Sequence, residues 1–511
     1  MENSSNTIIA RRTPLPALGS FAVVLISLGV LLYTNGVNVF GVLLVVSMGV
    51  GLLLLTALAW RSSFQIALFL LLIFVIVLTP PLPPFFGTAS WRIYQVVLVV
   101  LAPFIIFWRR RVTTWLDAWI AVFGSTMILS MLMGFISGNP PVLSDWFELA
   151  KPGFWWLIFS FSLGLGWRLE LKERGLWIFL GAGVVGGLLT LAQRQNWGDV
   201  NGWLTPLFII NEKLISNVGV RVAGTFVSPT QQATFMVTVL NVAVVLRLFS
   251  QRQTWLQRAL VLYACGAFTI VLMTGSKFGL LASTLSVFGI VLIRLWFTRI
   301  SSLYKLLLTG SLVLVVALAG TILMAQAYRV SATWLPREIQ MANPLTATLY
   351  RLGGIQDDLD PNALRISDWR KGWELGMAAP IFGQGPSKGI DELTYFHSEY
   401  VLVFRRYGFM GLLAFLFLYG SVALSAYRSF REAQTRQDAQ QQVVALSTLV
   451  SVLIFAIDGI FSNGALSDFQ LSAVLWWLIG LFYGSTVASQ TRKDIRVTFC
   501  PEVARSEIGH S

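Results

Sequence analysis

The stretch LRISDWRKGWELGMAAPIFGQGPSKGIDELTYFHSEYVLVFRRYGFMG, residues 364–411, is a polar segment that leads into an apolar one. It lies between long apolar runs, and it holds arginines, carboxylates, a Gly-x-Gly turn and His397, one of only two histidines in the chain. Ionisable groups in a membrane protein usually mark functional places. The prediction of the fold therefore rests on one question, which is whether the apolar runs around this stretch cross a membrane.

The composition indicates that they do. The chain has 511 residues, of which 56% are hydrophobic and 12% are charged, whereas a soluble domain carries about 25% charged residues. Apolar runs of 18 or more residues recur, and each is long enough to cross a hydrocarbon core of ~30 Å. The runs are continuous rather than alternating, which favours helices over membrane strands. We predict an all-α polytopic membrane protein of about fourteen transmembrane helices.

Basic residues set the topology. Lys and Arg are concentrated in alternate loops, and this places those loops in the cytoplasm together with both termini, beginning with Arg11 and Arg12. The net charge of +13 is then explained by anionic membrane lipids beside these loops, with no nucleic acid involved. The predicted spans are approximately 18–35, 38–60, 64–78, 92–108, 116–136, 153–168, 176–193, 233–249, 256–274, 278–298, 304–324, 409–427, 442–460 and 468–488.

This pattern divides the chain into four parts. Residues 1–324 form a transmembrane bundle of spans 1–11, and residues 325–404 form a large, partly helical periplasmic loop between spans 11 and 12. Residues 405–488 hold spans 12–14, and residues 489–511 form a polar, mobile cytoplasmic tail. A loop this long in a compact protein is usually functional or disordered, and its regularly placed tryptophans indicate a folded cap.

Local signals refine the large loop. The segment 367–379 has helical spacing, with Ser367 as a candidate N-cap and Pro380 as its terminator. Gly383 and Gly385 are expected to turn the chain back toward the membrane. Residues 398–408 are too few to cross a bilayer, so they are expected to form a short helix at the interface before the twelfth span.

His397 is the principal candidate for chemistry in this loop. An imidazole titrates near neutrality, so it can accept a proton from a hydroxyl nucleophile. The alternative is a histidine that lies at the lipid headgroup level without a chemical role. Ser398, Glu399 and Tyr400 follow it directly.

Three stretches resemble the O-antigen ligase and Wzy-type polysaccharide polymerase superfamily. The first is the succession Arg365, Trp369, Pro380, Gly383-Gln384-Gly385 and His397-Ser398-Glu399-Tyr400, followed by Gly408 and Gly411. The second is RVAGTFVSPTQQA, 221–233, in which Thr230 replaces an asparagine usual in the family. The third is TGSKFG, 274–279, in which Lys277 stands where the family commonly has arginine.

The resemblance implies an enzyme. It would be a glycosyltransferase of the bacterial inner membrane, with its active site on the periplasmic side, that uses glycan linked to undecaprenyl diphosphate. The mechanism implied is inverting, with no metal and no cofactor. His397, helped by Glu399, would activate the acceptor hydroxyl, and Arg405, Arg406 and Tyr400 are candidate substrate contacts. A chain-length regulator and a flippase of the same pathway are expected partners.

Three cations have a physical reason to bind the substrate diphosphate. Its negative charge grows as the glycosidic bond breaks, and fixed cations placed where charge develops lower the barrier. Arg221, Lys277 and Arg365 all fall on the predicted outer side. Their alternative role is to anchor the interface or to pair with loop carboxylates such as Asp368.

Three alternatives to a polymerase stay open, one of which is protein O-glycosylation by a ligase-like relative. An O-antigen ligase, which moves finished glycan to lipid A-core, often has His-Asn where this chain has His397-Ser398, and this difference favours the polymerase. A flippase would place charges within its spans and show internal repeats, whereas these spans are almost free of charge and no internal repeat is visible. Asp357, Asp358 and Asp360 read as a solvated turn rather than a metal site. The pairs Trp155-Trp156 and Trp476-Trp477 are expected in interfacial belts.

Overall fold

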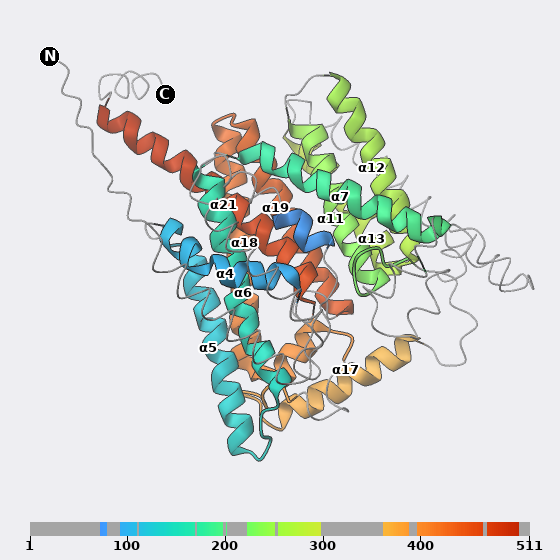
Figure 1. The fold of residues 1–511 in the computed structure, drawn as a ribbon, viewed down its shortest axis with the longest axis vertical. Helices are drawn as coiled ribbons and strands as arrows, with labels where there is room; N and C mark the ends of the chain where they lie inside the picture. Colours follow the sequence, from blue (N-terminus) through green and yellow to red (C-terminus); the bar gives the residue numbers. More distant parts are fainter. Residues whose placement is uncertain are drawn as a thin grey trace, which may run out of the picture.

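The computed structural model is a bundle of helices (Figure 1). It describes residues 72–78, 92–109, 112–168, 171–197, 201, 222–250, 254–297, 361–387, 396–462 and 468–499. The helices are α4 (Ile93–Arg109), α5 (Trp115–Ile136), α6 (Leu143–Arg168), α7 (Lys172–Gln195), α11 (Pro229–Phe249), α12 (Thr254–Thr274), α13 (Lys277–Trp296), α17 (Pro361–Met377), α18 (Glu399–Thr435), α19 (Ala439–Phe461) and α21 (Phe469–Phe499).

The predicted fold class is confirmed. Within the described ranges, 8 helices are long and apolar enough to cross a membrane, and no strand of a β-sheet occurs there. Each predicted span from 116–136 through 278–298, and each of the last three, overlaps one of these helices or α6. The predicted spans 18–35, 38–60 and 304–324 lie outside the described residues, as does most of 64–78.

Several predicted boundaries were wrong. α6 begins at Leu143, well before residue 153, and continues through Pro152. α21 continues to Phe499, so the first part of the predicted tail is helical. α17 begins at Pro361, which makes Ser367 an internal helix residue and not the N-cap. Proline suits a first helical position because its missing N–H would have no helical partner there.

α11 and α21 form the centre of the bundle, and α12 and α13 lie at its side. In the most apolar 18-residue window, 83% of the residues are buried in α11 and α21, against 22% in α12 and α13. α6 packs closely on α21 because Gly480 and Gly484 face the α6 backbone at Phe159 and Leu163. Small residues permit such close approach between membrane helices.

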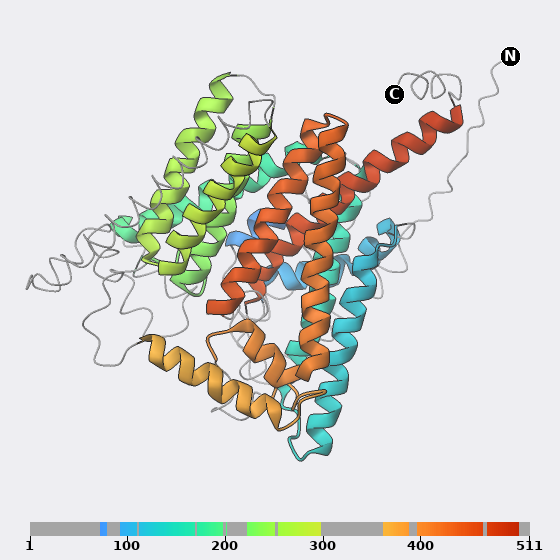
Figure 2. The same cartoon turned by 180° about the vertical axis from the view of Figure 1, so that it is seen from behind.

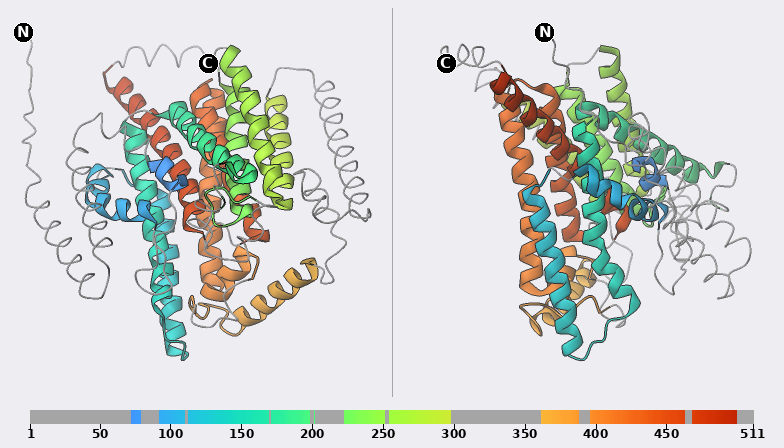
Figure 3. Two further views of the ribbon diagram at one scale, coloured as in Figure 1. Left: turned by 45° about the vertical axis from the view of Figure 1, so that its right-hand side comes forward. Right: turned by 60° about the vertical axis from the view of Figure 1, so that its left-hand side comes forward.

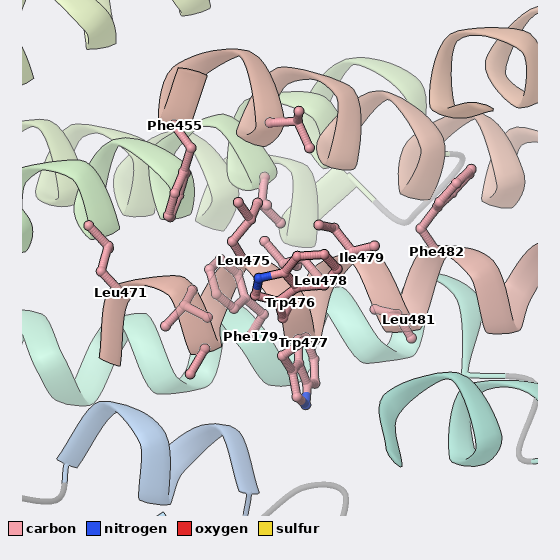
Figure 4. Packing of buried hydrophobic residues seen from close by; sticks show 14 of the residues in the cluster. Phe179, Phe455, Leu471, Leu475, Trp476, Trp477, Leu478, Ile479, Leu481 and Phe482 are labelled. Carbon is pink, nitrogen blue, oxygen red and sulfur yellow. The ribbon is translucent and has the colours of Figure 1, made fainter. Parts of the chain in front are cut away.

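The expected tryptophan belts were wrong for three of the four residues. Trp155, Trp476 and Trp477 are buried in the core, and the Trp155 and Trp476 rings stack with centroids 5.6 Å apart. Figure 4 shows Trp476 and Trp477 among the aliphatic side chains of the interior. Trp156 is partly buried, and its indole N–H donates to Asp117 over 2.8 Å. Buried aromatic area therefore holds α6 against α21.

α18 contains a break at Gly408, where φ is +65° and ψ is −167°. The predicted short helix before the twelfth span is confirmed as the part of α18 that precedes this break. Phe409 N donates to Pro380 O over 2.7 Å, and Met410 N donates to Ile381 O over 3.1 Å. Residues 380–385, here called the strap, therefore supply acceptors that the broken helix no longer provides.

The strap also donates a hydrogen bond to a backbone carbonyl next to the break. Arg406 O accepts hydrogen bonds from Gly385 N, at 2.9 Å, and from the Ser130 hydroxyl of α5. Gly383 and Gly385 have φ of +72° and +77°, so the predicted turn at these glycines is confirmed. A Cβ atom on Gly383 would collide with the Arg406 carbonyl. Glycine is required there by both conformation and space.

α17 lies obliquely across one end of the bundle, beneath the start of α18 (Figure 2). Gly372 and Gly376 of α17 face the side chains of Phe396, Val401 and Phe404. Two further views show the same arrangement from the sides (Figure 3). The strap and α17 together hold the beginning of α18, which follows His397.

We predict that Gly383→Ala destabilises the protein by about 1–3 kcal/mol, the usual cost of holding a side-chain-bearing residue in a strained backbone region. Gly420→Ala is the matched control, because Gly420 lies within α18 with no neighbouring atom within 4 Å of an added Cβ. The control should be neutral or stabilised by up to about 1 kcal/mol, since alanine favours helix. Unfolding midpoints of the purified full-length protein in detergent measure both effects. Equal midpoints for the two variants would contradict the role of the strap.

Candidate functional site

His397 lies in the turn directly before α18. Its φ of +50° is left-handed, a conformation that histidine adopts more readily than most residues. Phe396 and Ser398 on either side are buried, whereas the His397 side chain is 42% exposed. Its Nε2 atom lies 3.9 Å from the Asp368 carboxylate of α17. The imidazole therefore has an open side and an acidic neighbour.

The surroundings lower the pKa of His397 from its usual 6.5. Partial burial is the largest cause, and the positive charge of Arg365 lowers the pKa further. Asp368 acts in the opposite direction because its negative charge favours the imidazolium. The lowered pKa keeps the His397 ring neutral at physiological pH. The neutral ring is the form that accepts a proton.

The residues after His397 dock on the last turn of α19, residues 456–462, here called the α19 end. The Tyr400 hydroxyl donates to Ala456 O over 2.6 Å, and the Ser398 hydroxyl donates to Gly459 O over 3.3 Å. Glu399 is fully buried, and a Cβ on Gly459 would lie only 3.2 Å from its Cβ. Tyr400, a candidate substrate contact, thus has a structural hydrogen bond in this structure.

The second motif forms the start of α11 and the turn before it. Ser228 caps α11 and exchanges hydrogen bonds with Gln231 in a capping box. The Gln193 side chain of α7 binds both backbone groups of Gly224, accepting from N over 2.8 Å and donating to O over 3.0 Å. Gln232 donates to the Thr190 hydroxyl over 2.8 Å. Arg221 lies outside the described residues, although the segment that follows it is held firmly between α7 and α11.

Asp458 joins α11 to the α19 end. This carboxyl group is buried, and it accepts from the Ser462 hydroxyl over 2.6 Å and contacts the Thr234 hydroxyl at 3.1 Å. Thr234 follows Thr230 by one helical turn. The sequence interpretation missed Asp458, although a carboxylate inside an apolar run is itself a signal of function.

The third motif is the turn between α12 and α13. Ser276 caps α13 by accepting a hydrogen bond from Gly279 N over 3.1 Å. Gly279 packs against Ala233 of α11, and the Phe278 ring lies 6.2 Å from that of Phe461 in the α19 end. Lys277, the first residue of α13, is exposed at this end of the bundle.

Two of the motif stretches, and Thr234 directly after the third, therefore meet around one helix end. The turn that holds His397, the start of α11 and the start of α13 all contact residues 456–462. Arg365 is exposed on α17 and close enough to His397 to influence its charge. His397 and Lys277 thus lie directly beside residues that contact the α19 end, and Arg365 lies near His397.

Arg405 and Arg406 have a different environment. Both are buried, and Arg406 lies 3.6 Å from Glu148 of α6, which also pairs with Lys151 over 2.8 Å. Glu148 and Lys151 are buried as well. Removing one partner of a buried ion pair costs roughly 3–5 kcal/mol. The described contacts of Arg406 are thus with protein, and they tie the start of α18 to α6.

Comparison with known protein families decides the affiliation of this region. Residues 259–416 match the family model described as O-antigen ligase. This part of the chain, here called the O-antigen ligase domain after that model, is similar to the O-antigen ligase family. No curated protein matches the chain.

The O-antigen ligase domain contains much of the candidate site, including Lys277, Arg365 and His397. It ends within α18, so the α19 end and Asp458 lie beyond it. The start of α11 lies before it. The O-antigen ligase domain is therefore completed at this site by residues from both sides of the matched region.

We predict that the His397 imidazole titrates below pH 6.5. Asp368→Asn should lower the midpoint further, and Arg365→Gln should raise it, because each removes one of the opposing charges. Histidine NMR of a His510→Gln protein reports this ring alone, since the chain has two histidines. Glu374→Gln, on an exposed part of α17, is the control and should leave the midpoint in place. A midpoint above 6.5 would contradict the assignment.

Proposed function

We propose that the protein is a polysaccharide repeat-unit polymerase of the Wzy type. It would transfer a growing glycan from undecaprenyl diphosphate to the nonreducing sugar of an incoming lipid-linked repeat, on the periplasmic face of the inner membrane. The observation that carries a glycosyl-transfer function is the convergence around residues 456–462 of two motif stretches inside the O-antigen ligase domain and of Thr234, which directly follows the third stretch. No nucleotide is needed, because the diphosphate linkage of the donor supplies the energy.

In this proposal His397 is the general base. The acceptor hydroxyl loses its proton to the imidazole while its oxygen attacks the anomeric carbon. The bond from that carbon to the diphosphate oxygen breaks on the opposite face, which inverts the configuration. Asp368, 3.9 Å from Nε2, stabilises the imidazolium formed by proton uptake. Glu399, which would help the base, is buried at the start of α18.

The leaving diphosphate would be bound by Arg221, Lys277 and Arg365. Lys277 and Arg365 are exposed; Arg365 lies near His397, and Lys277 precedes Phe278, which contacts Phe461 of the α19 end. Arginine binds phosphate oxygens in a bidentate manner, whereas lysine acts as a point charge. Lys277 would therefore contribute mainly charge, and the two arginines would also orient the donor.

A ligase is the second candidate, because the matched family model is described as O-antigen ligase. The two activities share the donor and differ in the acceptor. Ser398 after His397 favours the polymerase, since ligases often have asparagine there. The lipid-linked glycans of a deletion strain separate the two. Single repeats on the carrier would support the polymerase, and accumulated long chains would support the ligase.

We predict that His397→Gln lowers turnover by roughly 10²–10⁴, the usual contribution of positioned proton transfer. Glutamine keeps a hydrogen bond but cannot take the proton, so donor binding should persist. Turnover of carrier-linked repeats in proteoliposomes measures the loss. A His397→Gln enzyme with near-normal turnover would remove His397 from the base role.

Arg365→Lys should also lower turnover, because an ammonium group cannot reproduce bidentate phosphate contacts. Its matched control is Arg370→Lys on the same helix, an exposed residue paired with Glu374 over 3.1 Å. The control should keep full activity, since its charge is retained and its partner is a surface carboxylate. Equal activities of the two variants would show that Arg365 does not bind the donor diphosphate.

A further inference from the structure

α17 carries a row of exposed apolar side chains. Ile366, Trp373 and Met377 are 62%, 46% and 51% exposed, and their spacing of seven and four residues places them on one face of the helix. Ile381 continues the row on the strap and is also exposed. Such a row of large side chains facing water would be unfavourable, so it indicates a contact surface.

The other sides of α17 already contact the rest of the protein. Gly372 and Gly376 face the start of α18, where the side chains of Val401 and Phe404 leave no room for a Cβ. Asp368 approaches His397 from a side of the helix away from Ile366. Because two sides of α17 are fixed in this way, the apolar row cannot turn inward.

The apolar row is continuous with the surface of α18. The Trp373 ring stacks on Phe404 at 4.3 Å and lies 6.1 Å from Phe409. Phe409 is itself exposed, together with Met410, Leu413, Leu416 and Phe417, in the apolar part of α18 that crosses the membrane. Exposed apolar residues of a spanning helix face lipid acyl chains. The row on α17 therefore continues the lipid-facing surface of α18.

The polar residues of α17 are arranged accordingly. Arg370 and Glu374 form an exposed pair next to the apolar row, with side chains 82% and 65% exposed. An exposed apolar row beside an exposed ion pair, on a helix that lies obliquely across the bundle end (Figure 2), fits the plane of a membrane interface.

We propose that α17 is an interfacial helix whose row of Ile366, Trp373 and Met377 is inserted among the acyl chains of the bilayer leaflet. The occupant is bulk membrane lipid, because the row is an exposed surface that continues the lipid-facing side of α18. Resting on the proposed function, this places the Asp368–His397 pair at the headgroup level, where the diphosphate of a lipid-linked donor lies.

Spin labels test the proposal on the full-length protein with Cys265 and Cys500 replaced by serine. Cysteines at Ile366, Trp373 and Met377 are labelled, and the protein is placed in phosphatidylethanolamine–phosphatidylglycerol vesicles. Leu413→Cys is the lipid-facing reference on α18, and Glu374→Cys is the water-facing reference on α17. Collision rates with oxygen, which concentrates in lipid, and with a water-soluble nickel chelate are compared.

The three row positions should match Leu413, with oxygen collisions exceeding those of the chelate, while Glu374 shows the reverse. Row positions that match Glu374 would place α17 in water and overturn the proposal. Protection from both reagents would indicate a covering protein surface and would also overturn it. Oxygen access that appears only after undecaprenyl phosphate is added would assign the row to the carrier chain instead.

Ile366→Cys and Met377→Cys suffice if Trp373→Cys unfolds the protein, because neither of the two residues stacks on α18. None of these measurements uses glycan transfer. Failure of the membrane contact is therefore distinguishable from failure of the polymerase assignment.

Discussion

A membrane helix can be broken only where other groups take up its backbone hydrogen bonds, because hydrocarbon offers none. At Gly408 this condition is met by the strap. Phe409 N and Met410 N donate to Pro380 O and Ile381 O, and Arg406 O accepts from Gly385 N. The break allows the start of α18 to leave the direction of the span and reach the α19 end. The position of His397 thus depends on an exchange of backbone partners between two segments of one loop.

Much of this arrangement could be predicted from the sequence, because its signals are local. The two glycines of the strap and the proline before them are typical turn residues, and the structure places them in a turn. Residues 398–408 are too short for a span, and they form a separate helical segment before Gly408. Long, continuous apolar runs predicted the all-helical class, because bilayer thickness and the need to satisfy backbone hydrogen bonds leave few other solutions.

Other features depend on partners far away in sequence, and local signals cannot provide these. Trp155 and Trp476 look like interface residues by composition, but they stack on each other across α6 and α21. Arg406, a predicted substrate contact, has Glu148 beside it, a partner that the sequence alone could not identify. The Asp458 carboxyl group accepts a hydrogen bond of 3.1 Å from the Thr234 hydroxyl of α11, which lies more than 200 residues earlier in the chain. The roles of Arg221, Lys277 and Arg365 toward a diphosphate remain proposals that rest on chemistry and position.

The α19 end has a consequence for engineering. It lies after residue 416, where the O-antigen ligase domain stops, yet it supports the turns that carry His397 and Lys277. The matched region is therefore not a transplantable module. A chimera that exchanges residues 259–416 between relatives would set a foreign loop on a native helix end, and mismatched side chains at positions such as Gly459 and Phe461 would disturb it. Compatible grafts should carry the α19 helix along with the loop that rests on it.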